Sequence, residues 1–106
     1  MVSVDIEELA DFALRIARGQ GAREVAEQLE PGADILKASR ALVLAYLKRR
    51  RARLDVEEVD KLAKRMLHAR GAAGGLWRWA CGIILSWRAY LDGEIDEPPR
   101  AAQPPA

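Results

Sequence analysis

LWRWACGIILSWRAYL, residues 76–91, contains all three tryptophans of the chain and is apolar over most of a helical surface. On a helical wheel, one apolar stripe includes Leu76, Trp79 and Ile83, and a second stripe lies beside it, while Trp77 falls outside both. A helix that is apolar nearly all round is either buried at the centre of its domain or covered by a partner. The sequence therefore predicts that this helix lies either at the centre of the core or at a subunit contact, and it leaves both alternatives open.

Several side chains of this stretch are of the types that anchor protein interfaces, which are tryptophan, tyrosine and arginine. The interface candidates are Trp77, Trp79, Trp87, Arg88 and Tyr90. Trp77 is the first of them, because it lies away from the two stripes. A partner protein or a second copy of the chain would bind there. Core packing explains the same residues at least equally well, and base stacking on the rings is a third interpretation.

Four further helical segments precede this stretch, and glycine or proline separates most of them. The expected ranges are about 5–18, 22–29, 34–53 and 55–70, with caps at Ser3, Asp34 and Asp55. The glycine-rich segment 71–75 is expected to break the chain before the last helix. No segment alternates apolar and polar residues, so no strand is expected. The sequence predicts an all-α fold, a compact bundle of four to five helices.

The chain of 106 residues has the length of one small domain. We expect a single helical domain over residues 1–96 and a disordered tail over 97–106, because four of the five prolines follow residue 97. Acidic residues at the N-terminus, such as Asp5 and Glu7, exclude a secretory signal peptide. Arginines interrupt the longest apolar stretch. These features predict a soluble, cytoplasmic protein that does not contact a membrane.

The overall charge is close to balanced, with 17 basic and 16 acidic side chains and a net charge of +1. A balanced chain removes the simplest argument for a nucleic-acid partner, which is an overall basic composition. The chain has 19 alanines and 13 arginines but no asparagine and no threonine. This usage is typical of thermophile proteins and equally of proteins encoded by GC-rich genomes, and composition does not separate the two.

Residues suited to catalysis are few. The chain has one histidine, His68, near an expected helix end, and one cysteine, Cys81, in an apolar setting. The segment 71–75 lacks the lysine and hydroxyl residue of a phosphate-binding loop. Adjacent carboxylates such as Glu57 and Glu58 point about 100° apart on a helix and do not converge on one ion. We therefore expect no enzyme activity, no metal site and no cofactor.

A dense basic cluster follows the third expected helix. Lys48, Arg49, Arg50, Arg51 and Arg53 place five positive charges within six residues. Arginine offers a planar fork that matches phosphate, so the cluster predicts contact with a phosphate backbone. The alternative is a solvated helix end whose charges favour the helix dipole and pair with the acidic residues just downstream, at 55, 57 and 58.

The stretch LRIARGQGAREVAEQL, residues 14–29, resembles the start of a helix-turn-helix. It is similar to the pattern of bacterial response-regulator and sigma-factor DNA-binding domains, and the resemblance extends over residues 14–47. It implies that 22–29 is the supporting helix and that the helix after Asp34 is the recognition helix in the major groove. Lys37 and Arg40 would then read bases, and Arg23 would lie near a phosphate.

The sequence supports two alternative functions. The first is a small non-catalytic protein that binds nucleic acid, DNA or RNA, through the basic helix end, either as a subunit of a nucleoprotein assembly or as a transcription regulator. The alternative is an interaction adaptor or small structural subunit that docks through its tryptophan-rich helix and binds no nucleic acid.

Overall fold

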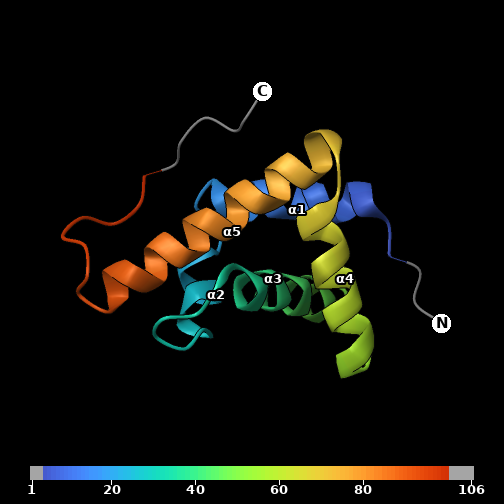
Figure 1. Ribbon diagram of the computed structural model, residues 1–106, viewed down its shortest axis with the longest axis horizontal. Coiled ribbons are helices and arrows are strands. Elements are labelled where there is room, and N and C mark those ends of the chain that lie inside the picture. Colours follow the sequence, from blue (N-terminus) through green and yellow to red (C-terminus); the bar gives the residue numbers. More distant parts are fainter. Residues whose placement is uncertain (1–3, 101–106) are drawn as a thin grey trace.

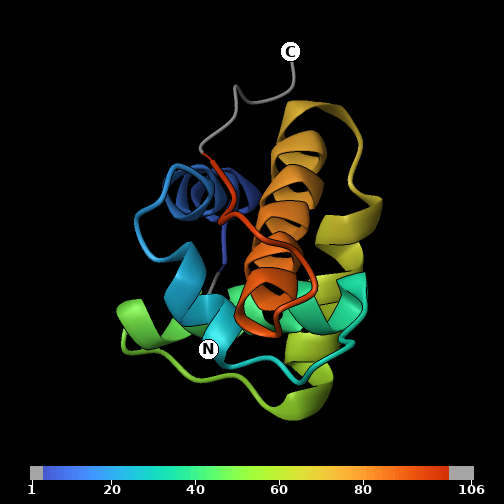
Figure 2. The same ribbon diagram turned by 90° about the vertical axis from the view of Figure 1, so that its left-hand side faces the viewer.

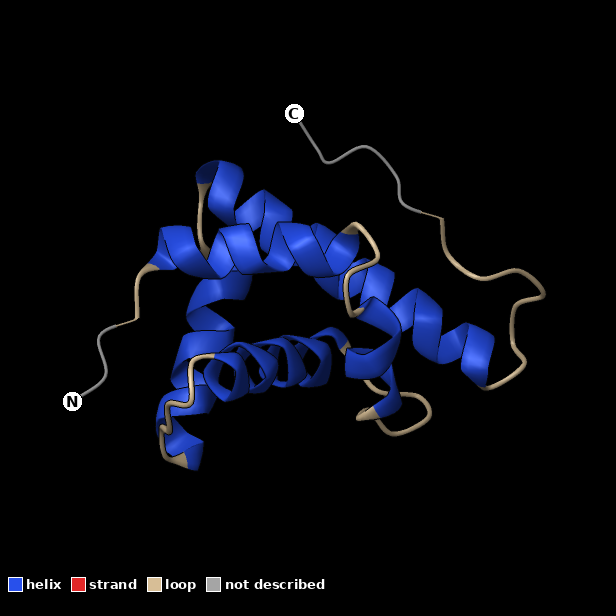
Figure 3. Cartoon of the chain, turned by 180° about the vertical axis from the view of Figure 1, so that it is seen from behind, coloured by secondary structure: helices blue, strands red, loops and turns tan. Residues whose placement is uncertain are grey.

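The computed structural model describes residues 4–100, and these residues form an all-helical fold without strands. Five helices follow one another along the chain: α1 (Ile6–Ala17), α2 (Ala22–Glu27), α3 (Ile35–Arg49), α4 (Val56–His68) and α5 (Gly71–Leu91). The radius of gyration, 12.9 Å, matches the value of about 13 Å expected for a compact domain of 100 residues. The predicted fold class is confirmed (Figure 1, Figure 3).

The tryptophan-rich helix α5 is the centre of the domain. It packs against each of the other four helices. It passes in front of α1 and above α3 in Figure 1, and α1 and α2 lie on the same side of it in Figure 2. Its side chains at Trp77, Ala80, Cys81 and Ile84 are completely buried. Of the two alternatives for this helix, the structure therefore shows the central position in the core.

Aspartates begin three of the helices. The carboxylates of Asp5, Asp34 and Asp55 accept hydrogen bonds of 2.8–2.9 Å from backbone N–H groups in the first turns of α1, α3 and α4. Two of these caps agree with the sequence prediction. The predicted cap of α1 at Ser3 lies outside the described residues, and Asp5 takes that role.

The glycine-rich segment 71–75 is helical, which corrects the predicted break. The helix α5 begins at Gly71, where φ is +81°. At Gly74 an added Cβ would lie 1.9 Å from the carbonyl oxygen of Ala69, so only glycine lets the helix approach this carbonyl. Arg78 closes the same corner by donating to the carbonyls of Leu67 and Ala69, each at 2.9 Å. The glycines therefore allow a tight join between α4 and α5.

The other helix ends differ from the predicted ranges by a few residues. Helix α2 ends at Glu27, α3 at Arg49 and α4 at His68, so the basic cluster straddles the end of α3. Residues 93–100 carry no helix. The rest of the predicted tail, 101–106, lies outside the described residues.

A polar link lies in the middle of the core. The Trp77 indole N–H donates to the Ser39 hydroxyl at 2.8 Å, and that hydroxyl donates to the carbonyl of Ala63 at 2.9 Å. All three residues are inaccessible to solvent. The link joins α5 to α3 and α3 to α4, so it fixes the rotation of three helices in a region where water does not compete.

We expect Ser39→Ala to lower the free energy of unfolding by about 1–3 kcal/mol, because the buried indole N–H loses its acceptor. In a Trp77→Phe background the same substitution is expected to have a clearly smaller effect, since no donor is left without a partner. Urea denaturation of the four proteins measures this coupling. An equal loss in both backgrounds would show that the hydrogen bond contributes nothing specific.

Two glycines of α5 give a matched comparison. Gly74→Ala is expected to destabilise the domain by about 1–3 kcal/mol, because the new methyl group overlaps the Ala69 carbonyl. Gly82 is exposed and has no atom within 4 Å of an added Cβ, so Gly82→Ala is expected to stabilise by about 0.5–1 kcal/mol through helix propensity. Thermal or urea unfolding measures whether each substitution raises or lowers the free energy of unfolding. A stabilising effect of Gly74→Ala would contradict the close contact with Ala69.

Candidate functional site

The end of α3 closes in a Schellman motif that has arginine at the position usually taken by glycine. The Arg51 N–H donates to the Lys48 carbonyl at 3.1 Å and the Ala52 N–H to the Leu47 carbonyl at 2.9 Å. Arg51 has φ +53° and is the single non-glycine residue with positive φ between residues 4 and 100. For a residue with a side chain, the left-handed conformation raises the free energy by about 1–2 kcal/mol.

Two other helices end in the same way but with glycine. At the end of α1, Gly19 has φ +93°, and at the end of α5, Gly93 has φ +77°, each with the same pair of backbone hydrogen bonds. The chain therefore uses the ordinary residue at two equivalent positions and arginine at the third. Backbone strain of this kind is found where a side chain has a role that offsets it.

One arginine of the basic cluster is part of the fold. Arg50 forms an ion pair with Glu8 of α1 and a hydrogen bond of 2.9 Å to the hydroxyl of Tyr46. The Tyr46 hydroxyl in turn donates to Glu8 at 2.7 Å. Burial raises the pKa of Tyr46, and its hydrogen bond to the Glu8 carboxylate raises the pKa further. Arg50 therefore ties α3 to α1.

The other four cations of the cluster are exposed and form no ion pair with residues 4–100: Lys48, Arg49, Arg51 and Arg53. The acidic residues just downstream, Asp55, Glu57 and Glu58, form no ion pair with them. Asp55 caps α4 at the Glu58 N–H, and its hydrogen bond to the Glu58 carboxyl is the main reason that the pKa of Glu58 is raised. These carboxylates thus interact with one another and with the start of α4.

Three of the free cations surround one hollow of about 500 Å³. Lys48, Arg51 and Arg53 line it together with Leu44, Leu47, Ala52 and Leu54, and no carboxylate lines it. The negative end of the α3 dipole also lies here, but its charge of about half a unit is smaller than the three full positive charges. The hollow is therefore suited to an anion.

The residues that the helix-turn-helix resemblance assigned to DNA all have acidic partners. Arg23 pairs with Glu27 at 3.3 Å, and its guanidinium lies 6.0 Å from the centre of the Trp87 ring. Lys37 pairs with Glu30 at 3.4 Å. These two pairs lie on the surface, where ion pairs are weak and exchange easily with other partners.

Arg40 is held more firmly than Arg23 and Lys37. It forms an ion pair with Asp60 of α4, and its Nε lies 2.7 Å from the carboxylate. Hydrogen bonds from Lys64 and Arg40 lower the pKa of Asp60, so this carboxylate stays ionised beside them. Arg40 therefore links α3 to α4, and none of these three cations lines the hollow.

The interface candidates of the tryptophan-rich helix lie largely in the domain itself. Trp77 is completely buried, which corrects its prediction as the first contact residue: in a domain this small, the side of α5 away from the main stripes still faces α3 and α4. The rings of Trp87 and Tyr90 are half-buried and meet edge to face, with centres 5.7 Å apart. Trp79 is half-buried and packs against the core.

Arg88 lies at the edge of the core and stabilises the fold. It forms two hydrogen bonds with Asp92, at 2.7 and 3.2 Å, and it is only 17 % exposed. Its guanidinium also donates to the carbonyls of Ala26 and Leu29, at 3.3 and 3.1 Å, where α2 ends. Arg88 thus caps the end of α2 from α5. The spacing of four residues to Asp92 was the one sequence signal for this role.

The single cysteine lies in the core, and the single histidine lies on the surface. Burial raises the pKa of the Cys81 thiol to about 12, and His68 is exposed at the end of α4. Within residues 4–100 no three histidine, cysteine, aspartate or glutamate side chains come together as metal ligands. In the same part of the chain, none of the helices combines the length and the apolar character needed to cross a membrane.

No protein-family model, no curated protein and no solved structure matches this chain. The chemistry of the chain's own surface is therefore what indicates a function.

We expect the Cys81 thiol to resist alkylation in the folded protein. At pH 8 a thiol with a pKa of about 12 is ionised in only about one molecule in ten thousand, and it is also inaccessible. Iodoacetamide should label the protein rapidly in urea and very slowly in buffer, as followed by mass spectrometry. Rapid labelling of the folded chain would show that α5 is less tightly packed than the structure indicates.

Proposed function

We propose that this chain is a non-catalytic nucleic-acid-binding protein that holds the phosphate backbone at the end of α3. One observation carries the proposal: Lys48, Arg51 and Arg53 surround a hollow that has no carboxylate, and none of them pairs with another residue between 4 and 100. A phosphate takes up the charge that the fold leaves unbalanced. Nucleoprotein subunits and transcription regulators both need such a contact.

The side chains around the hollow favour a duplex over a single strand. Single-stranded nucleic acid is bound by stacking bases on exposed aromatic rings. The hollow is lined by aliphatic residues, and the nearest aromatic ring on α3, that of Tyr46, is 5 % exposed. A duplex needs no stacking surface, because its phosphates are reached from outside.

The conformation of Arg51 is the second support. Glycine would satisfy the Schellman motif better, as it does at the ends of α1 and α5. The arginine therefore gives up stability at a position where its guanidinium points into solvent beside Lys48 and Arg53. A contact with phosphate offsets this loss, because arginine binds phosphate through two parallel hydrogen bonds.

The test is a salt titration with duplex DNA and duplex RNA. Contact with three phosphates predicts a slope of about −2.7 in log K against log salt, and a dissociation constant of roughly 10⁻⁴–10⁻⁶ M near physiological salt. Arg53→Ala should weaken binding to every sequence alike and make the slope shallower by about 0.9. Arg65→Ala removes an exposed arginine in the last turn of α4 and is the matched control, which should change neither quantity.

Arg51→Gly gives the sharpest single result, because its two effects have opposite signs. We expect the free energy of unfolding to rise by about 1 kcal/mol as the left-handed strain is relieved. Affinity for duplex should fall by the loss of one phosphate contact, about as it does for Arg53→Ala. A variant that is more stable and binds as tightly as the original chain would overturn the proposal, as would binding that does not change with salt.

A further inference from the structure

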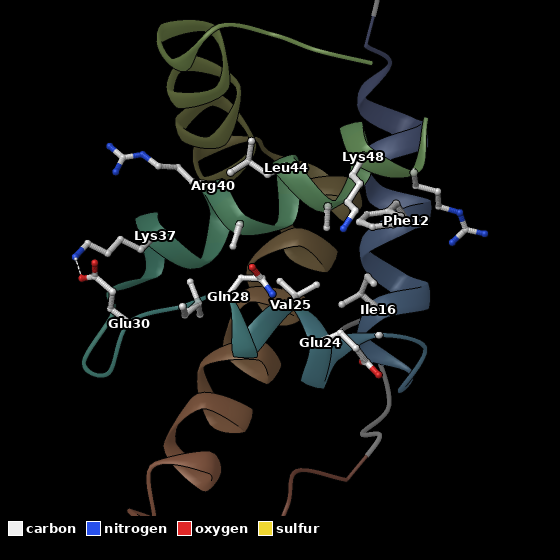
Figure 4. A pocket seen from close by; sticks show the side chains of 15 residues that line it. Phe12, Ile16, Glu24, Val25, Gln28, Glu30, Lys37, Arg40, Leu44 and Lys48 are labelled. Atoms are coloured by element: carbon white, nitrogen blue, oxygen red, sulfur yellow. Dashed lines mark hydrogen bonds and ion pairs between the residues drawn. The ribbon is translucent and has the colours of Figure 1, made fainter. Parts of the chain in front are cut away.

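A second and larger hollow lies on the outer side of α3. This groove of about 860 Å³ runs between α1, α2 and α3 (Figure 4). Its apolar lining comes from all three helices: Phe12, Ile16, Val25, Leu29, Ala41 and Leu44. Because the lining is drawn from three fixed elements, the groove has a defined shape.

The outer face of α3 carries an apolar patch between its charged residues. Leu42 and Val43 fill the core on the inner side, while Leu44 is 54 % exposed on the outer side. Ala41 and Ala45 flank Leu44 along the groove and are half-buried. An exposed apolar surface bounded by polar groups is typical of a site for another protein.

The charges around the groove are arranged unequally. At one end Lys37 is already paired with Glu30, which lies 3.4 Å away (Figure 4). At the other end Lys48 and Arg49 are exposed and pair with no residue between 4 and 100. The acidic lining residues are Glu30 and, from α2, Glu24. A ligand that covers the apolar lining therefore meets two free cations at that end.

We propose that the groove binds an amphipathic helix of a partner protein, with an apolar face against Leu44 and acidic side chains beside Lys48 and Arg49. An extended peptide would leave its backbone groups without partners on this apolar lining, because residues 4–100 offer no strand edge. A helix satisfies its own backbone. The helices α1 to α5 are all packed against the core, so a helix that is free to dock is assigned to another protein.

The experiment selects random 16-residue peptides displayed on phage against the full chain and removes those that also bind Leu44→Gln. We expect the enriched peptides to carry apolar residues at helical spacing and glutamate or aspartate near one end. Synthetic copies should bind the original chain at least tenfold more tightly than Leu44→Gln. The substitution keeps the net charge, and Leu44 is exposed, so the variant is expected to fold.

Val56→Gln is the matched control, because Val56 is 85 % exposed on α4 and does not line the groove. It should leave peptide binding unchanged. Replacing the acidic residues of a selected peptide by lysine should abolish its binding. The proposal is overturned if no peptide is enriched, if the enriched peptides lack acidic residues or helical spacing, or if Val56→Gln weakens them as much as Leu44→Gln.

The groove and the phosphate hollow are distinguishable, although Leu44 and Lys48 lie on the ridge between them. Arg53 lines only the smaller hollow, so Arg53→Ala should leave peptide binding intact while it weakens duplex binding. Ala41 lines only the groove, so Ala41→Gln should weaken peptide binding and leave duplex binding intact. Loss of both ligands in both variants would overturn the assignment of the groove to a protein helix.

Discussion

The buried hydrogen bond from Trp77 to Ser39 is the constraint on which the arrangement of helices depends. A polar N–H in a dry core must have an acceptor, and the one hydroxyl that reaches it belongs to α3. That hydroxyl is itself oriented by the Ala63 carbonyl of α4. The rotation of α5 therefore determines which face of α3 turns inward, and the opposite face, with Leu44, becomes surface.

The central position of α5 also limits where this protein can meet other molecules. Trp77 is used within the core, and Arg88 is used to cap α2. By holding the end of α2, Arg88 keeps one wall of the apolar groove in place. The residues with the strongest composition signal for an interface thus build the scaffold, and the two proposed binding sites lie on the outer side and at the end of α3.

Features with a local cause were predictable from the sequence, and features that depend on tertiary contacts were not. Asp34 and Asp55 cap their helices through hydrogen bonds within the next three residues, which a short sequence pattern records. In the sequence Gly74 looked like a helix breaker. Glycine is needed there because the carbonyl of Ala69, which precedes α5, lies too close for a side chain. No sequence pattern marks Ser39, and its role as hydrogen-bond acceptor becomes visible only when the structure places Trp77 beside it.

The candidate sites were likewise predictable only in part from the sequence. The basic run at 48–53 was visible in the sequence, but which of its members are free was not, since Arg50 pairs with Glu8 some forty residues away. The groove had one sequence signal, the apolar residues on both faces of the third helix. Only the placement of α1 and α2 shows that one of these faces is open.

A net charge of +1 is compatible with a phosphate site because the charges are not evenly distributed. Five carboxylates are engaged in ion pairs with particular cations of the fold: Glu8, Glu27, Glu30, Asp60 and Asp92. Screening limits the reach of the others to about 10 Å at 0.1 M salt. The potential at the end of α3 is therefore set by local charges, which are Lys48, Arg51 and Arg53 around a hollow without a carboxylate and the nearby Asp55, Glu57 and Glu58, and the net charge of the whole chain does not describe it.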